Sequence, residues 1–252
     1  MVDNHLVRKV KSTKFNVDHL RQNNLHFLLG KQHFKFCVID TKTNHCLLLE
    51  DYLIGSNDQP NEIVETLQVI FEHHHLLNAG FWNSIKLAFL NPKSVLVPSH
   101  LFDKDLLSEY LQLNCELAPS EGRYYYRHNM GKMVNVFASS KKIVEWFKQL
   151  YPNLNIHLLH YSSALIESIP RQTDTSRIRS MAMFLNVDST EILVHEGDKL
   201  LYCNQFVHHS ADELLKYALI VMDQLQLDPN FSKVQLWGNI SNQSDYFKLL
   251  YK

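Results

Sequence analysis

Residues 25–53 read LHFLLGKQHFKFCVIDTKTNHCLLLEDYL, and this stretch decides the fold. It contains three apolar runs separated by two short polar segments. The runs cover residues 25–29, 34–40 and 45–52, and the polar segments cover residues 30–33 and 41–44. Apolar runs of this length, joined by short polar segments, are typical of antiparallel strands connected by hairpin turns. The stretch therefore predicts three successive antiparallel strands.

An amphipathic helix and a buried strand are predicted to follow. Between residues 61 and 78, apolar side chains recur at the spacing of one helix face; Pro60 precedes this segment and Gly80 ends it. Residues 85–90 form a compact apolar run that stops at Asn91. The predicted order over residues 25–90 is thus strand, strand, strand, helix, strand.

The same order returns in residues 181–237. Strands are predicted over residues 181–187, 191–195, 200–207 and 234–237, and a helix over residues 211–225. The core face predicted for this helix consists of Leu214, Leu215, Ala218, Leu219, Met222 and Leu225. A repeated unit of this kind implies two similar lobes that face each other across a cleft.

The pattern also predicts the domain boundaries. The first lobe covers residues 15–170 and contains a small inserted subdomain over about residues 94–131. Residues 171–180 are polar, contain three arginines and no aromatic residue, and are predicted to be a linker. The second lobe covers residues 181–252. Its last helical pattern is unfinished at Lys252, so we expect the protein to continue beyond that residue.

Composition places the chain among ordinary globular proteins. It has 252 residues, a formal net charge of -1 and 45% hydrophobic residues, which gives no overall attraction to nucleic acid or anionic membrane. Its seven glycines stand apart, which excludes the dinucleotide-binding G-x-G-x-x-G, the P-loop and the G-x-S-x-G nucleophile elbow. Apolar runs are too short for a secretory signal or a bilayer span. We therefore expect a cytoplasmic protein without direct membrane insertion.

Histidines, cysteines and tyrosines offer weaker signals. Successive helical residues point in different directions, so the run His73 to His75 does not place three imidazoles on one ion, and we expect no metal site there. The four cysteines lack C-x-x-C spacing, so we expect four reduced thiols. Cys203 near His208 is more typical of a core thiol than of a nucleophile and its base. The run Tyr124 to Tyr126 lacks a surrounding basic stripe, and we expect no nucleic-acid ligand.

Two segments carry a resemblance to a known fold family. Residues 133–147, MVNVFASSKKIVEWF, continuing through NIHLLH at 155–160, resemble the segment that finishes the first lobe of PilM- and FtsA-like pilus and division proteins. Residues 183–194, MFLNVDSTEILV, followed by Gly197, are similar to their second phosphate-binding strand pair. The resemblance implies an α/β protein with mixed sheets and a duplicated actin-like ATPase (ribonuclease H-like) fold. It points to an uncharacterised bacterial family with that fold.

The resemblance also implies a site formed by two turns in the cleft. In active members each hairpin begins D-x-G, because an aspartate holds Mg²⁺ while a glycine lets backbone amides close around phosphate. In the first hairpin, Asp40 is at the aspartate position, but Lys42 takes the place of glycine. In the second hairpin, Asn186 takes the place of aspartate and Asp188 takes the place of glycine. The implied nucleotide-binding residues are Asp40, Thr41, Lys42 and Thr43 in the first turn, Asp188, Ser189 and Thr190 in the second, and Gly238 and Asn239 after the last strand.

These departures favour a degenerate nucleotide site. A negative charge at Asp188 beside a phosphate, 4 Å away at an effective dielectric of 20, costs roughly 4 kcal/mol. The first hypothesis is therefore a non-catalytic scaffold that binds an unidentified partner protein and needs no cofactor. The alternative is an ATP-binding protein or ATPase with a rewired site, in which Asp40 holds Mg²⁺ and Lys42 pairs with phosphate. For each turn residue alone, hydrogen bonding to its own backbone is the simpler interpretation.

Overall fold

The structure, a computed structural model, describes residues 6–55, 59–128, 132–168, 179–187, 189–197 and 199–250. The chain divides into two compact units, residues 1–164 and 165–252. Asp188 and most of the predicted linker, residues 171–178, lie outside the described residues.

The first unit is built on a six-stranded sheet with the order β1-β4-β3-β2-β5-β9. Its strands are β1 (Leu6–Lys11), β2 (Asn23–Leu29), β3 (His33–Asp40), β4 (Cys46–Leu53), β5 (Ser84–Phe89) and β9 (Ile156–His160). The predicted three-stranded meander is confirmed, since β2, β3 and β4 pair antiparallel in succession. Strands β5 and β9 continue the sheet in parallel. At the other edge, β1 carries exposed basic residues: Arg8, Lys9 and Lys11.

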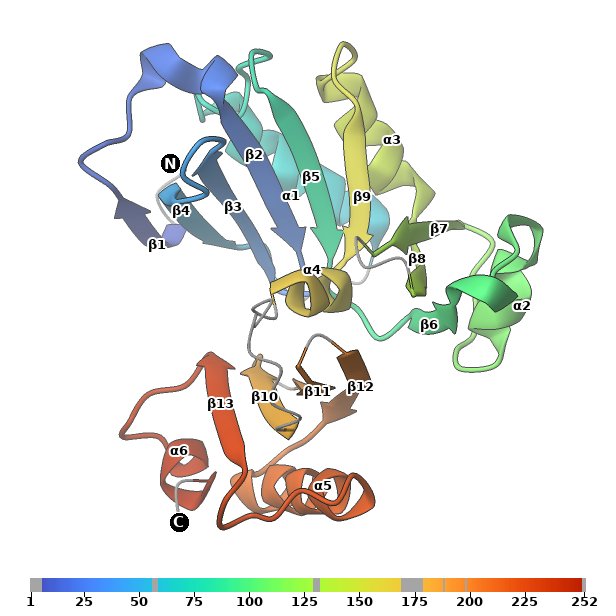
Figure 1. Cartoon of the computed structure of the whole chain (residues 1–252). Helices are drawn as coiled ribbons and strands as arrows, with labels where there is room; N and C mark the ends of the chain where they lie inside the picture. Colours follow the sequence, from blue (N-terminus) through green and yellow to red (C-terminus); the bar gives the residue numbers. More distant parts are fainter. Residues whose placement is uncertain are drawn as a thin grey trace. The chain divides into compact units, whose positions relative to one another are not determined.

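Helices α1 (Pro60–Glu72) and α3 (Lys141–Leu150) lie on the same face of this sheet (Figure 1). The hydroxyl of Ser140 caps α3 by accepting a hydrogen bond from the amide of Ile143. Aromatic side chains fill the space between helices and sheet: the rings of Phe27 and Phe147 are 5.1 Å apart, and Phe71 meets Trp146 edge-on at 5.0 Å. This core holds the β3–β4 hairpin in place from one side.

The helix predicted over residues 61–78 is too long. α1 ends at Glu72, and residues 75–78 form turns. Near its end, the carbonyl of Phe71 accepts hydrogen bonds from the amide of His74 and the side chain of Asn78, at 3.1 and 2.6 Å. The side chain of Asn78 thus supplies a partner for a terminal carbonyl that further helix would have satisfied.

A second, three-stranded sheet belongs to the same unit, with the order β6-β8-β7. It consists of β6 (Ser94–Pro98), β7 (Glu121–Arg127) and β8 (Met133–Ser140), and α2 (Leu107–Gln112) packs on it through Leu111. This unit also contains the 3-10 turns Val17–Gln22, Ser99–Leu101 and Lys104–Leu106, and helix α4 (Tyr161–Ser168) begins in it and ends beyond residue 164. β8 leads directly into α3, so the small sheet is anchored to the main core.

The second unit contains a four-stranded sheet with the order β12-β11-β10-β13. Its elements are β10 (Arg179–Leu185), β11 (Ser189–Glu196), β12 (Lys199–Val207), α5 (Ala211–Gln224), β13 (Lys233–Gly238) and α6 (Asp245–Leu250). Three antiparallel strands are followed by a helix and a parallel strand, the same order as β2, β3, β4, α1 and β5 in the first unit.

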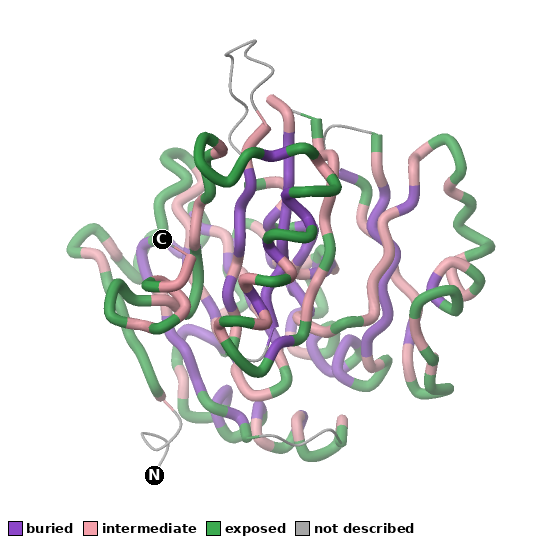
Figure 2. Tube along the Cα trace, turned by 90° about the horizontal axis from the view of Figure 1, so that it is seen from below, coloured by how far each residue is buried: buried purple, intermediate pink, exposed green. Residues whose placement is uncertain are grey.

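The orientation of α5 differs from the prediction. Leu214, Ala218, Val221 and Met222 pack against the sheet, whereas Leu219 is 44% exposed and Leu215 is partly exposed. Apolar residues occur on almost every side of this helix, so helical spacing fits more than one buried face. Figure 2 shows the burial of each described residue along the chain. Leu219 and Ile220 of α5 are among the exposed large apolar residues.

Candidate functional site

The first predicted turn, residues 40–43, joins β3 to β4. The Oδ1 atom of Asp40 accepts hydrogen bonds from the amides of Lys42 and Thr43, at 2.7 and 3.2 Å. These two bonds, that from Lys42 first, lower the pKa of the Asp40 carboxyl. The hydroxyl of Thr41 donates to the carbonyl of Gln22 at 2.8 Å, which ties the turn to the start of β2. The turn therefore closes on its own aspartate.

The hydrogen bonds within the first turn determine which of its backbone amides are available to a ligand. Backbone amides that converge on one point form an anion-binding concavity. Here the amides of Lys42 and Thr43 converge on Asp40 Oδ1, so both of these donors already have an acceptor within the turn. The side chain of Lys42, at the position expected for glycine, is exposed.

In the second unit, the structure brings Gly238 and Asn239 beside the end of β10. The amide of Asn239 donates to the carbonyl of Leu185 at 2.8 Å, and the amide of Asn186 donates to the carbonyl of Ser189 at 2.8 Å. Gly238 has φ +95°, and a Cβ atom there would lie 2.2 Å from the oxygen of Leu185. The close approach of β13 to β10 thus requires glycine at this position.

Ser189 and Thr190 are engaged by neighbours within the second unit. Thr190 is buried, and its Oγ1 lies 2.8 Å from Nε2 of His208; the other ring nitrogen of His208 lies 3.3 Å from the hydroxyl of Tyr246. The Ser189 hydroxyl accepts a hydrogen bond from Gln205 at 3.0 Å. Sequence reasoning missed this role of His208, because its partners lie 18 and 38 residues away along the chain.

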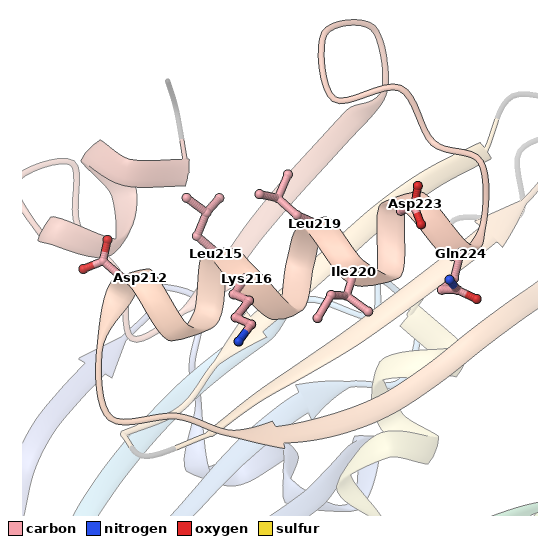
Figure 3. A pocket seen from close by; sticks show the side chains of 7 residues that line it. All are labelled: Asp212, Leu215, Lys216, Leu219, Ile220, Asp223 and Gln224. Carbon is pink, nitrogen blue, oxygen red and sulfur yellow. The ribbon is translucent and has the colours of Figure 1, made fainter.

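Figure 3 shows a pocket of about 520 Å³ along the outer side of α5. The residues that line it, which we call the α5 face, are Asp212, Leu215, Lys216, Leu219, Ile220, Asp223 and Gln224. Leu219 and Ile220 are 44% and 50% exposed, and Asp212 and Asp223 lie toward the two ends of the row. The α5 face therefore combines three apolar side chains with Lys216 among them, and it carries a carboxylate toward each end. Sequence reasoning missed it by assigning Leu215 and Leu219 to the core.

The histidine run does not converge on one point. Nδ1 of His73 lies 2.9 Å from the carbonyl of Val69, Nε2 of His74 lies 3.1 Å from Glu50, and the ring of His75 stacks on that of His74. In the part of the chain that the structure describes, no three His, Cys, Asp or Glu side chains are grouped to hold a metal ion. The same residues contain no helix whose length and apolar character would let it cross a membrane.

Glu50 is the centre of a buried charge network in the first unit. It is fully buried, and it binds Lys9 Nζ at 2.7 Å, His74 Nε2 at 3.1 Å and the hydroxyl of Tyr52. Burial alone raises the pKa of a carboxyl, but the hydrogen bonds from His74, Lys9 and Tyr52 outweigh it and lower the pKa of Glu50 to about 2. Glu50 therefore remains ionised inside the protein.

Cys203 lacks the properties of a nucleophile. Its thiol donates to Oε1 of Glu191 at 3.1 Å. Burial first, and then the neighbouring Glu191, raise the pKa of Cys203 well above its ordinary value. The protonated thiol is a poor nucleophile, although Cys203 is only partly buried and is not part of the hydrophobic core.

Comparison with known proteins identifies the fold. The family described as "Protein of unknown function (DUF3822)" matches residues 12–252, and no curated protein matches the chain. A Bacteroides thetaiotaomicron protein with an actin-like ATPase fold and unknown function is similar at a TM-score of 0.79 and 17% identity, over 94% of this chain and 89% of that one. A chain of the PilM-PilN type IV pilus biogenesis complex is similar with a TM-score of 0.60 and 13% sequence identity. The match covers 91% of this chain and 85% of that one. The fold implied by the sequence resemblance is confirmed.

Proposed function

Since the chain belongs to the DUF3822 family and has the actin-like ATPase fold, we propose that it is a non-catalytic protein of this fold that binds a partner protein. Its nucleotide site is, in this proposal, degenerate. The observation that carries the proposal is the closure of the first turn, in which the amides of Lys42 and Thr43 already bind the carboxylate of Asp40.

The geometry of this turn opposes both parts of a Mg-nucleotide site. A phosphate would have to displace Asp40 Oδ1 from the two amides, and a negative group so close to phosphate repels it. Both amides bind Oδ1 of the carboxylate, so Mg²⁺ bound to that oxygen would share it with two donors. With lysine in place of glycine at position 42, close approach of the backbone to a phosphate is also less favourable.

A partner protein has a suitable surface on the α5 face. Leu215, Leu219 and Ile220 offer apolar area to bury, and Asp212 and Asp223 flank it, about 16 Å apart along the helix axis. The complementary partner is a segment with apolar side chains, an acidic side chain opposite Lys216 and a basic side chain at each end. The similar PilM chain comes from a complex with another protein, PilN, which supports a partner-binding role for this fold.

We expect neither Mg-ATP nor Mg-ADP to bind. Calorimetric titration up to millimolar nucleotide should give no heat of binding, and the melting temperature should not move. Binding at 10–100 μM, or about 5 to 7 kcal/mol, would contradict a degenerate site. If it also disappeared in Asp40→Ala and persisted in Asp228→Ala, the rewired-site alternative would hold. Asp228 is the matched control because it accepts a similar hydrogen bond, from the amide of Asn230.

Replacing Leu219 by aspartate should abolish partner binding through the α5 face. The change adds a charge among the apolar side chains, and because Leu219 is 44% exposed it should affect folding little. Val69→Asp on α1 is the matched control, since Val69 is also 44% exposed. Immobilised wild type and Val69→Asp should retain the same protein from a lysate of the source organism, and Leu219→Asp should lose it at least tenfold. Equal retention by all three would exclude the α5 face.

A further inference from the structure

Two cysteines lie at the base of the hairpin that carries the first turn. Cys37 is in β3 and Cys46 begins β4. The strand pairing places Cys46 opposite Ile39, with a register shift between Val38 and Ile39. Because alternate residues of a strand point to the same side, Cys37 and Ile39 share one face of the sheet, and Cys46 lies diagonally across from Cys37. The thiol of Cys46 donates to the carbonyl oxygen of Leu48 at 3.4 Å, and each of the two thiols shifts the pKa of the other.

The two thiols are in unequal environments. Cys46 is exposed, whereas Cys37 is only partly so. The neighbouring thiol of Cys37 lowers the pKa of Cys46 against the opposing effect of burial, and the pKa of Cys37 is raised. A lowered pKa increases the share of thiolate, which is the reactive form of cysteine. By contrast, burial raises the pKa of Cys115 and of Cys203.

We propose that Cys46 is an oxidation site for hydroperoxides, and that Cys37 resolves the product into a reversible disulfide. The exposed thiol beside a less accessible one is the arrangement that this chemistry requires. In the described part of the chain no third His, Cys, Asp or Glu joins the pair to complete a metal site.

The reaction balances with hydrogen peroxide as the only oxidant. The Cys46 thiolate attacks one peroxide oxygen, so that an S–O bond forms and the O–O bond breaks; the second oxygen leaves as hydroxide and takes up a proton as water. The sulfur of Cys46 becomes a sulfenic acid. Cys37 then attacks that sulfur, an S–S bond forms, the S–O bond breaks, and the hydroxyl leaves as water with the proton of Cys37. A thiol reductant reverses the sequence.

A disulfide between Cys37 and Cys46 would link β3 to β4 across the first turn. Residues 38–45, which include Asp40 to Thr43, would lie inside the closed loop. Oxidation would therefore restrict the turn that the actin-like fold uses as its first phosphate hairpin, whatever that turn binds in this protein.

The test is thiol counting after hydrogen peroxide treatment of the purified chain at pH 7. The protein is unfolded, alkylated with N-ethylmaleimide and examined by intact mass and peptide mapping. For wild type we expect the number of alkylated thiols to fall from four to two, with the loss of about 2 Da and a peptide that links Cys37 to Cys46. Dithiothreitol should restore all four.

Variants separate the two roles. In Cys37→Ser, Cys46 should stop at the sulfenic acid and be labelled by dimedone, without a disulfide. Cys46→Ser should not react at the same peroxide dose. Cys115→Ser is the matched control and should form the Cys37–Cys46 bridge as wild type does. Four alkylated thiols in treated wild type, a bridge between another pair, or oxidation of Cys115 or Cys203 as fast as Cys46 would each overturn the proposal.

Discussion

Glu50→Ala is expected to lower the free energy of unfolding by about 3 kcal/mol at pH 7. The carboxylate is fully buried and receives hydrogen bonds from Lys9, His74 and Tyr52, so its removal leaves these donors without their acceptor and opens a cavity. The side chain of Lys9 is half exposed and can reach water, but that of His74 is only 12% exposed. Most of the cost therefore comes from the buried partners.

The hydrogen bonds of Glu50 also make the free energy of unfolding depend on pH in the acid range. The pKa of Glu50 is about 2 in the folded protein, against an ordinary value of 4.5. Its contribution is therefore complete above about pH 4.5 and is lost as the pH falls toward 2. Urea unfolding at pH 7 and pH 3 should show a larger acid loss for wild type than for Glu50→Gln. Glu65→Gln, which changes an exposed glutamate of α1, is the control and should behave as wild type. Parallel acid loss in wild type and Glu50→Gln would show that the network does not set this dependence.

Gly238→Ala is expected to lower the free energy of unfolding by about 3 to 5 kcal/mol, because it combines an unfavourable φ with a steric overlap. The added Cβ would lie 2.2 Å from the carbonyl oxygen of Leu185, which is backbone and has no rotamer with which to move away. β13 must then separate from β10, and the 2.8 Å hydrogen bond from the amide of Asn239 to Leu185 is lost.

Gly197→Ala isolates the backbone effect. Gly197 also has a positive φ, +57°, but a Cβ there meets no atom within 4 Å. The Gly197→Ala substitution should lower the free energy of unfolding by only about 1 kcal/mol, the penalty for a left-handed residue. Thermal or urea unfolding of both variants measures the difference. Equal losses would mean that the contact of Gly238 with Leu185 imposes no constraint of its own.

Local patterns predicted the elements of the fold, and longer-range contacts decided the rest. The β2–β3–β4 meander follows from apolar runs and polar turns alone. The orientation of α5 does not, because its apolar residues surround the helix and only the sheet beneath selects Val221 over Leu219. The end of α1 depends on a side chain seven residues away, that of Asn78.

In the candidate site, too, some contacts could be predicted from local sequence and others could not. That Asp40 binds the amides that follow it is a local property of aspartate in a turn, and the sequence favours it. The pairing of Thr190 with His208 brings together residues that are distant along the chain, and no local pattern signals it. The contact between Cys37 and Cys46 depends on the register of β3 and β4.

The basic residues of β1 have a consequence for the behaviour of the protein at high concentration. An edge strand offers unpaired backbone groups to any other chain that can add a strand. Arg8 and Lys11 are exposed on β1, whereas Lys9 is ion-paired with Glu50. A second copy of the chain that approached this edge in the same way would bring like charges together, so β1 protects the sheet against aggregation by strand addition.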